Sequence, residues 1–163
     1  MTRPRLTLMI GGPASGKSFM LKKLRPGLPV VDSDRIKATH PDYSPNDASW
    51  LTSVHAWSSR KATEEFYRRL SRRESFAFDG TGCNAEKYVS FISAARAAGY
   101  DTEAIYVTCD LATALKRNAE RERHVDEDML REKYAVIATS FEIVARYVDR
   151  VEVVNGITER SKS

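Results

Sequence analysis

Short apolar runs alternate along the chain with longer stretches in which apolar residues recur every three or four positions. Runs of this length that are mostly apolar on both faces are typical of buried parallel strands. The runs predict five strands, at Arg5–Ile10, Leu28–Val31, Ser75–Phe78, Thr102–Val107 and Val151–Val154. Glycine, proline and acidic residues follow most of them, which marks the turns at which the strands end.

The stretches between the strands have helical periodicity. They predict helices at 17–24, 48–73, 84–98 and 111–122, and one that begins at Asp126. Asn84 and Asp110 suit the N-cap position of two of these helices. Strands that alternate with helices predict a three-layer α/β fold in which helices flank a five-stranded parallel sheet. We expect one domain over residues 1–155 and a flexible tail over 156–163.

Composition adds a few limits to this picture. The chain has 163 residues, of which 42% are hydrophobic and 29% charged, as in ordinary globular domains. No apolar run approaches the roughly 20 residues that span a bilayer, and we expect a cytoplasmic protein without a membrane partner. The two cysteines, Cys83 and Cys109, are too few for a disulfide framework and are expected to be free thiols. The net charge of +4 favours a nucleic-acid partner only slightly.

The turn after the first strand carries the most specific motif in the sequence. It fits the pattern G-x-x-x-x-G-K-[ST] without a gap, in the residues Gly11, Gly12, Pro13, Ala14, Ser15, Gly16, Lys17 and Ser18. Between a strand and a helix, such a loop turns its backbone N–H groups toward the phosphates of a nucleotide. The lysine neutralises the β- and γ-phosphates, and the serine hydroxyl ligates Mg²⁺. The motif therefore predicts a P-loop NTPase fold with ATP and Mg²⁺ as cofactors.

Two further strand ends carry carboxylates. Asp32 and Asp34 follow the second strand, and Asp79 ends the third. In parallel sheets the ligands bind at the carboxyl ends of the strands, so we expect these residues to share one crevice with the loop. Asp34 is placed to act as a general base on a hydroxyl acceptor, or else as the N-cap of a short helix at 35–38. Asp32 suits a structural role or a contact with Mg²⁺ through water.

The remaining motifs separate the classes of P-loop protein. Gly80 follows Asp79, so the glutamate that activates water in ATPases is missing, and no N-K-x-D motif for guanine is present. A kinase needs neither, but it does need arginines near the transferred phosphate. Arg117 and Arg121 lie four positions apart, as on one helix face, and suit such an arginine lid. The alternative is a solvated helix face on which these arginines pair with neighbouring glutamates.

The sequence resembles two groups of kinases. The P-loop, the stretch from Val30 to Asp34 and the residues Asp79 to Gly82 resemble zeta-toxin-type kinases, as does the stretch His40 to Tyr43. The regions 115–121 and 125–134 resemble the 5′-kinase domain of phage-type polynucleotide kinases. The chain contains neither the phosphatase domain of the latter nor most of the C-terminal portion of the former, so the UDP-sugar substrate does not transfer readily.

This resemblance implies a role for each matching residue. It makes Asp34 the general base, places Lys17 and Ser18 on ATP and Mg²⁺, and places Arg117 and Arg121 on the phosphates, with Lys17 and Arg121 assisting catalysis. Residues expected on the acceptor side, besides Asp34, are Lys37, Asp79 and Thr81.

The acceptor itself stays open between three hypotheses. The first is a nucleic acid, most simply DNA, modified at a 5′-hydroxyl end or on a hydroxymethylated pyrimidine. Its motivation is a set of basic residues, Lys22, Lys23, Arg25, Arg68, Arg69, Arg72 and Arg73, and three aromatic residues for base stacking, Tyr43, Trp50 and Trp57. Tryptophans at helical spacing also suit a core. The second hypothesis is a zeta-toxin-like or other small-molecule kinase, and the third is a nucleotide-dependent regulatory module without catalysis.

Overall fold

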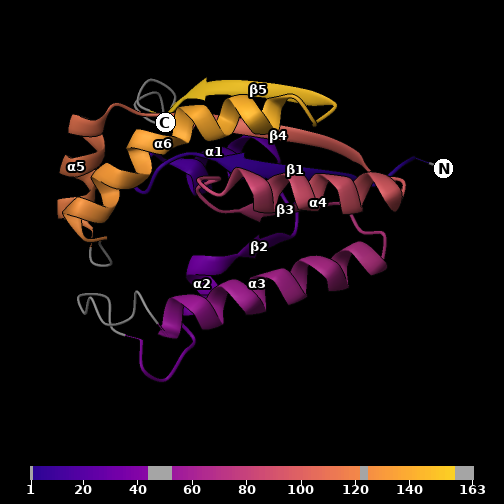
Figure 1. Cartoon of the computed structure of the whole chain (residues 1–163), viewed down its shortest axis with the longest axis horizontal. Helices are drawn as coiled ribbons and strands as arrows, with labels where there is room; N and C mark the ends of the chain where they lie inside the picture. Colours follow the sequence, from indigo (N-terminus) through magenta and orange to yellow (C-terminus); the bar gives the residue numbers. More distant parts are fainter. Residues whose placement is uncertain (1, 44–52, 122–124, 157–163) are drawn as a thin grey trace.

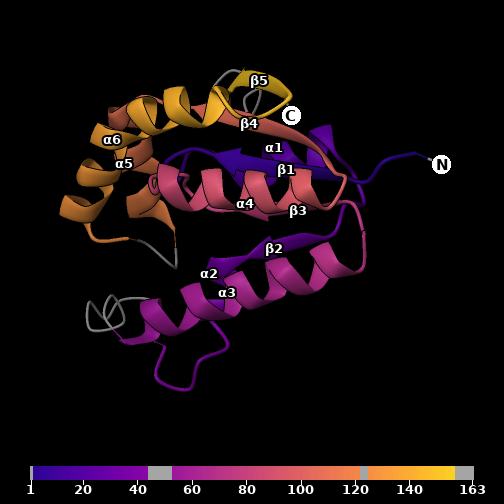
Figure 2. The same cartoon turned by 45° about the vertical axis from the view of Figure 1, so that its right-hand side comes forward.

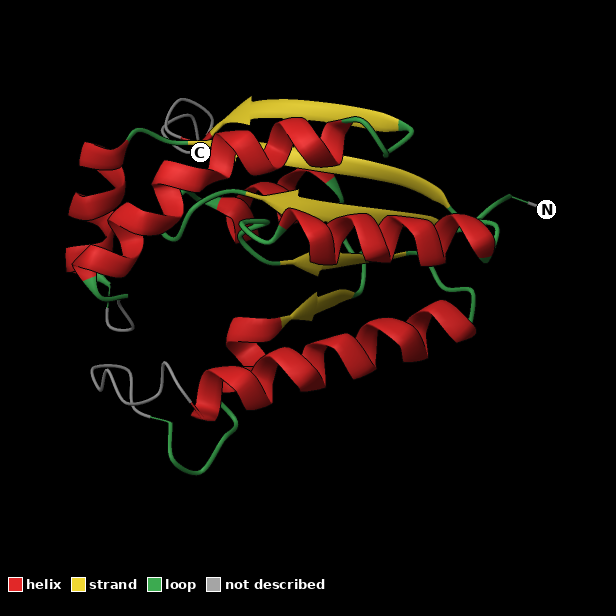
Figure 3. Ribbon diagram, viewed as in Figure 1, coloured by secondary structure: helices red, strands yellow, loops and turns green. Residues whose placement is uncertain are grey.

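The computed structural model describes residues 2–43, 53–121 and 125–156. Its centre is a sheet of five parallel strands in the order β2-β3-β1-β4-β5, which confirms the predicted fold class (Figure 1). The strands are β1 Arg5–Ile10, β2 Val30–Asp32, β3 Phe76–Asp79, β4 Asp101–Thr108 and β5 Arg150–Asn155. All their carboxyl ends therefore lie at the same edge of the sheet, where the arrowheads point in Figure 3.

Helices cover both faces of the sheet, as the alternating pattern predicts. They are α1 Lys17–Leu24, α2 Ser33–Lys37, α3 Ser53–Ser71, α4 Ala85–Ala97, α5 Leu111–Glu120 and α6 Glu127–Ala145. One face packs against α1 through Met20 and Leu21. The other face packs against α3, α4 and α6 through residues such as Phe66 and Phe91, whose rings stack at 3.9 Å (Figure 2).

Short polar caps fix where several helices begin. Asn84 and Asp110 accept hydrogen bonds from the backbone N–H groups of Lys87 and Thr113, which confirms both predicted N-caps. The short helix after β2 begins earlier than predicted, at Ser33 rather than Arg35. Asp32 caps it by accepting bonds from the N–H groups of residues 34 and 35. The alternative in which Asp34 is the cap is therefore wrong.

Two other helix boundaries differ from the predictions. The helix predicted over 111–122 ends at Glu120, and Arg121 is its C-cap with an extended backbone (φ −85°, ψ 143°). Arg117 and Arg121 consequently do not share a continuous helix face. The long third helix is described from Ser53 onward, and its predicted first residues, including Trp50, lie outside the described residues. The predicted tail, after Gly156, also lies outside them.

Two expectations from composition can be compared with the described residues. Cys83 and Cys109 are free thiols, as predicted. None of the helices described here combines the length and apolar character needed to cross a bilayer.

Candidate nucleotide and acceptor site

The loop that begins at Gly11 joins β1 to α1 and forms a compact turn. Gly16 has a left-handed backbone (φ 97°), which glycine adopts without steric cost. Gly12 lies against the ring of Tyr134 from α6, and a Cβ at position 12 would come within 2.0 Å of that ring. The Tyr134 hydroxyl donates to the carbonyl of Pro13 at 2.9 Å. The glycine pattern therefore serves both the turn and the close approach of α6.

The loop fits a triphosphate by its chemistry. The hydroxyl of Ser15 is buried and, in the described part of the chain, has no hydrogen-bond partner. A buried polar group of this kind is costly unless a ligand or water satisfies it. The N-terminus of α1 adds its positive dipole end, and Lys17 stands in its first turn. The loop borders a cavity of about 750 Å³, within the range usual for ligand sites.

Ser18 and Asp79 form an oxygen pair at the nucleotide side of this cavity. The Ser18 hydroxyl donates to Asp79 Oδ2 at 2.8 Å. Burial raises the pKa of the Asp79 carboxyl, and the nearby Lys17 ammonium opposes part of this rise. Hydroxyl and carboxylate oxygens of this kind suit Mg²⁺, which binds few protein ligands and keeps several waters. Asp79 was expected on the acceptor side, yet its carboxylate here is bonded to the P-loop serine.

The carboxylate expected to act as the base lines the same cavity. Asp34 Oδ1 lies 3.9 Å from the ammonium of Lys37, whose side chain is only 8% exposed. Thr81, the other residue expected near the acceptor, also lines the cavity. Its carbonyl accepts the N–H of Gly11 at 3.0 Å, and its hydroxyl accepts the N–H of Cys83 at 3.2 Å. Both of its described bonds fix the loop after β3 beside the P-loop.

A histidine that the sequence did not single out lies beside Lys37. Lys37 Nζ lies 3.1 Å from Nδ1 of His55, which stands at the start of α3. The pKa of His55 is lowered to about 4. The largest cause is partial removal from water, and the next largest is repulsion from the ammonium groups of Lys37 and Lys133. No motif marks a lone histidine in a helix, so only the folded chain reveals this contact.

Lys87 is a second residue that the sequence did not single out. It extends from the first turn of α4 into the cavity, and its ammonium donates to the Ser59 hydroxyl at 3.3 Å. The same ammonium lies 5.3 Å from the centre of the Phe78 ring and 5.7 Å from that of Phe91. Desolvation lowers the pKa of Lys87.

Both arginines of the predicted lid line the cavity. The Arg117 guanidinium reaches the P-loop itself and donates to the carbonyls of Ser15 at 3.3 Å and Ala14 at 3.5 Å. Gly156, just after β5, is a further residue that the sequence did not mark. A Cβ at this position would lie 2.2 Å from the carbonyl of Ser15, so β5 and α5 both converge on the P-loop.

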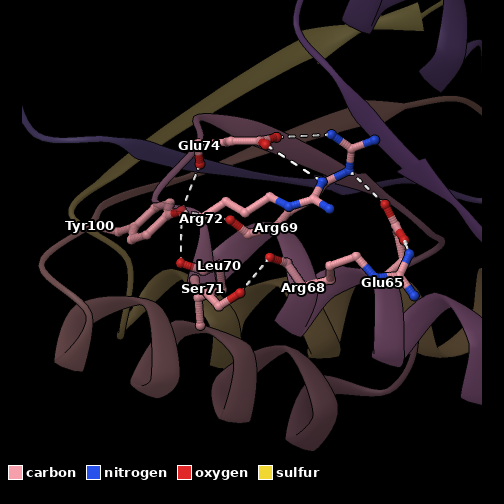
Figure 4. Close-up of polar contacts among 8 residues, drawn as sticks. All are labelled: Glu65, Arg68, Arg69, Leu70, Ser71, Arg72, Glu74 and Tyr100. Atoms are coloured by element: carbon pink, nitrogen blue, oxygen red, sulfur yellow. Dashed lines mark hydrogen bonds and ion pairs between the residues drawn. The ribbon is translucent and has the colours of Figure 1, made fainter.

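The arginines near the end of α3 are engaged by neighbouring residues. Glu65 pairs with Arg68 and Arg69, and Glu74 pairs with Arg69 and Arg72 (Figure 4). Arg73 donates to the carbonyl of Ala98. These residues also lie at the end of α3 away from the cavity, because the residues of α3 that line the cavity are near its start. Two glutamates therefore offset two of the four positive charges of the predicted stripe.

The aromatic residues proposed for base stacking divide between two places. Tyr43 lines the main cavity. Trp57 instead meets His40 edge to face at 4.8 Å and lines a separate groove between β2 and α3. The buried face of α3 holds Val54, Ser58, Ala62, Phe66 and Leu70, so Trp57 is outside the core face to which the periodicity assigned it.

A scan against protein-family models finds an AAA domain over residues 6–143, which is most of the chain. The chain belongs to this AAA domain family. The matched residues include the P-loop, Asp34, Asp79, Arg117 and Arg121, and so hold the whole cavity described above. No curated protein sequence matches this AAA domain.

Three solved structures show what the fold of this AAA domain is similar to. A candidate kinase from Chloroflexus aurantiacus is 16% identical, with a TM-score of 0.67, over 94% of this chain and 89% of the other. A chain of the PezAT toxin–antitoxin system of Streptococcus pneumoniae is 13% identical, with a TM-score of 0.69, over 96% of this chain and 69% of the other. A chain of the Pnkp1/Rnl/Hen1 RNA repair complex is 13% identical, with a TM-score of 0.68, over 87% of this chain and 46% of the other.

These likenesses confirm the predicted resemblance at the level of the fold. At such low identity they do not carry over a substrate. The AAA domain thus has a P-loop kinase-like fold.

Proposed function

We propose that this AAA domain is an ATP-dependent kinase that transfers the γ-phosphate to a hydroxyl of a nucleic acid. The acceptor would be a 5′-hydroxyl end or a hydroxymethylated pyrimidine base in DNA. One observation carries the proposal: the P-loop with its Ser18–Asp79 pair and the Asp34–Lys37 pair line one and the same cavity. A phosphate donor and a deprotonated hydroxyl could therefore meet there.

In this proposal each side chain has a defined task. The P-loop N–H groups and Lys17 bind the triphosphate, and Arg117 and Arg121 stabilise the charge on the transferred group. Ser18 and Asp79 would hold Mg²⁺, which offsets negative charge on the phosphates when bound. Asp34 accepts the proton of the acceptor hydroxyl. The oxygen forms its bond to the γ-phosphorus as the bond from that phosphorus to the bridging oxygen breaks, leaving ADP.

Two observations support a nucleic acid as the acceptor. The net charge is positive, and the fold is shared with a chain of an RNA repair complex. The arginines at the end of α3 pair with glutamates, which weakens the argument that a long nucleic-acid strand binds along this helix. Contacts of the acceptor are therefore concentrated at the cavity, near its reacting end.

A small-molecule kinase is the second candidate. A cavity of about 750 Å³ would accommodate a nucleotide sugar or nucleoside beside ATP, and the fold is shared with the PezAT system. A nucleotide-dependent module without catalysis is the third, and would use the P-loop but not Asp34.

A transfer screen with γ-labelled ATP tests these candidates together. The acceptors are single-stranded DNA and RNA with 5′-hydroxyl ends, duplex DNA with hydroxymethylated bases, nucleosides and nucleotide sugars. Label on a nucleic acid is the expected result. Label on nucleotide sugars alone would favour the second candidate, and ATP binding without any transfer would favour the third.

A further inference from the structure

We propose that the outer edge of β5 is a dimer interface, at which two copies of this chain pair their β5 strands antiparallel about a two-fold axis through Val151. The pairing would join the sheets of the two copies into one continuous sheet. None of the residues of β5 lines the cavity, so this interface goes beyond the proposed kinase function.

The two edges of the sheet differ in how open they are. At one edge, β2 has only three residues, and α2 and α3 line a groove beside it. At the other edge, β5 has six residues that pair with β4 from Arg150 to Asn155 without a bulge or a proline. Within the described residues, no strand pairs with the outer side of β5, which lies at the top of Figure 1. Natural sheets usually shield such edges, because they are templates for pairing with another strand.

The side chains of β5 alternate between the two faces of the sheet. Glu152 contacts Arg25, and Val154 packs in the apolar cluster of α1, so these two side chains lie on the α1 face. Val151 and Val153 therefore point to the opposite face, where they are 42% and 56% exposed. A second β-strand beside β5 would cover part of this apolar surface, which favours association.

The charges of β5 make its edge complementary to a second copy of itself. Arg25 lies closer to Glu103, at 2.8 Å, than to Glu152, at 3.4 Å. Arg150 is exposed and has no ion pair in the part of the chain that the structure describes. A two-fold axis through Val151 places Arg150 of each copy directly opposite Glu152 of the other. Opposite charges in such cross-strand pairs stabilise the pairing of the strands.

Other registers and another occupant fit this edge less well. An axis through Glu152 would place two carboxylates opposite each other, and an axis through Val153 would place Glu152 opposite Val154. Residues 157–163, which follow β5 in the chain, include only one apolar residue, Ile157, to cover the valines. Antiparallel pairing also points the carboxyl ends of the two sheets in opposite directions, so both cavities would stay open.

Analytical ultracentrifugation of the unchanged protein at rising concentration tests for the dimer. We expect a monomer–dimer equilibrium, and hydrogen exchange of the β5 amides that slows as the dimer forms. A monomer at every concentration would overturn the proposal. So would β5 amides protected equally at every concentration, which would assign the edge to a segment of the same chain.

A matched pair of variants tests the place of the interface. Val151→Lys sets two like charges opposite each other at the axis and removes two valines from the contact, so the dissociation constant should rise about 10–100-fold. Val136→Lys is the control, because Val136 is 44% exposed, much like Val151, but lies on α6. Both variants should bind ATP as the unchanged protein does, which shows that they are folded. Equal dimerisation of the two variants would contradict the interface.

Cysteine cross-linking tests the register independently. Directly opposite residues of antiparallel strands have Cα atoms about 4.5–5.5 Å apart, within reach of a disulfide. Val151→Cys should therefore form a covalent dimer with oxidised glutathione, whereas Val153→Cys, which would face Asp149 of the second copy, should link far less. The unchanged protein gives the background from Cys83 and Cys109. Linking mainly through Val153→Cys, or in neither variant, would overturn the register about Val151.

Discussion

At the scale of single residues, the site depends on which carboxylate performs which task. Asp32 is engaged as the cap of α2, and Asp79 is bonded to Ser18. Asp34, one residue after the start of α2, is left to face the cavity beside Lys37. The sequence places three carboxylates near strand ends, and only the structure shows that they have different hydrogen-bond partners.

Replacing Asp34 tests its assignment as the general base. Asp34→Asn keeps the shape of the side chain but removes the proton acceptor, so transfer should slow by about 10²–10⁴-fold. The affinity for ATP, measured by calorimetry, should stay nearly unchanged because the proposed mechanism assigns Asp34 to the acceptor hydroxyl and not to the triphosphate. If the affinity for ATP collapsed instead, Asp34 would belong to the nucleotide site.

The titration of His55 gives a second test at this scale. An NMR titration should give a midpoint of about 4 for His55, against about 6.5 for an unperturbed histidine. The unfolded chain then binds more protons than the folded chain between these two values. The contribution of His55 to stability is therefore present above pH 6.5 and is lost as the pH falls toward 4.

A variant checks the cause of this shift. Lys37→Met should raise the midpoint of His55, because it removes a positive charge 3.1 Å from the ring. A midpoint that stayed at about 4 in Lys37→Met would exclude Lys37 as a cause and leave desolvation and the other nearby lysines.

At the scale of elements, α5 and α6 are joined to the P-loop by direct contacts. Tyr134 of α6 covers Gly12 and bonds to Pro13, and Arg117 of α5 bonds to the carbonyls of Ala14 and Ser15. The helix that carries Arg117 and the helix that follows it are thus both joined to the P-loop. The sequence indicates a lid but not this coupling, since the contacts span more than 100 residues.

A pair of variants tests the contact between Gly12 and Tyr134. Gly12→Ala places a methyl group within 2.0 Å of the ring, so the ring or the loop must move. We expect a loss of about 1–3 kcal/mol in the free energy of unfolding, as for other overpacked sites. Denaturant titration measures it. Adding Tyr134→Leu to Gly12→Ala should recover part of this loss, whereas strictly additive losses would contradict the packing account.

At the scale of the whole molecule, the carboxyl ends of all five strands lie at one edge of the sheet, and the cavity lies at this edge. The residues that line the cavity come from β2, β3, α5 and α6 and from the loop that follows β1. A nucleotide bound there should therefore stabilise the entire domain and not one loop.

Thermal unfolding measures this coupling. ATP at about 100 times its dissociation constant should add about 2.7 kcal/mol to the free energy of unfolding, by mass action. Lys17→Ala should abolish most of the stabilisation because the β- and γ-phosphates lose their cation. Lys61→Met, far from the P-loop along α3, should behave like the unchanged protein.

The sequence alone determined the P-loop and the order of strands and helices along the chain, because these follow from a motif of adjacent residues and from local periodicity. It did not determine the contacts of His55, Lys87 and Gly156, nor the pairing of the arginines of α3 with Glu65 and Glu74. Local patterns indicate whether each segment forms a strand, a helix or a loop. Which side chains meet in a cavity, and which charges neutralise one another, is decided only when segments distant in the chain pack together.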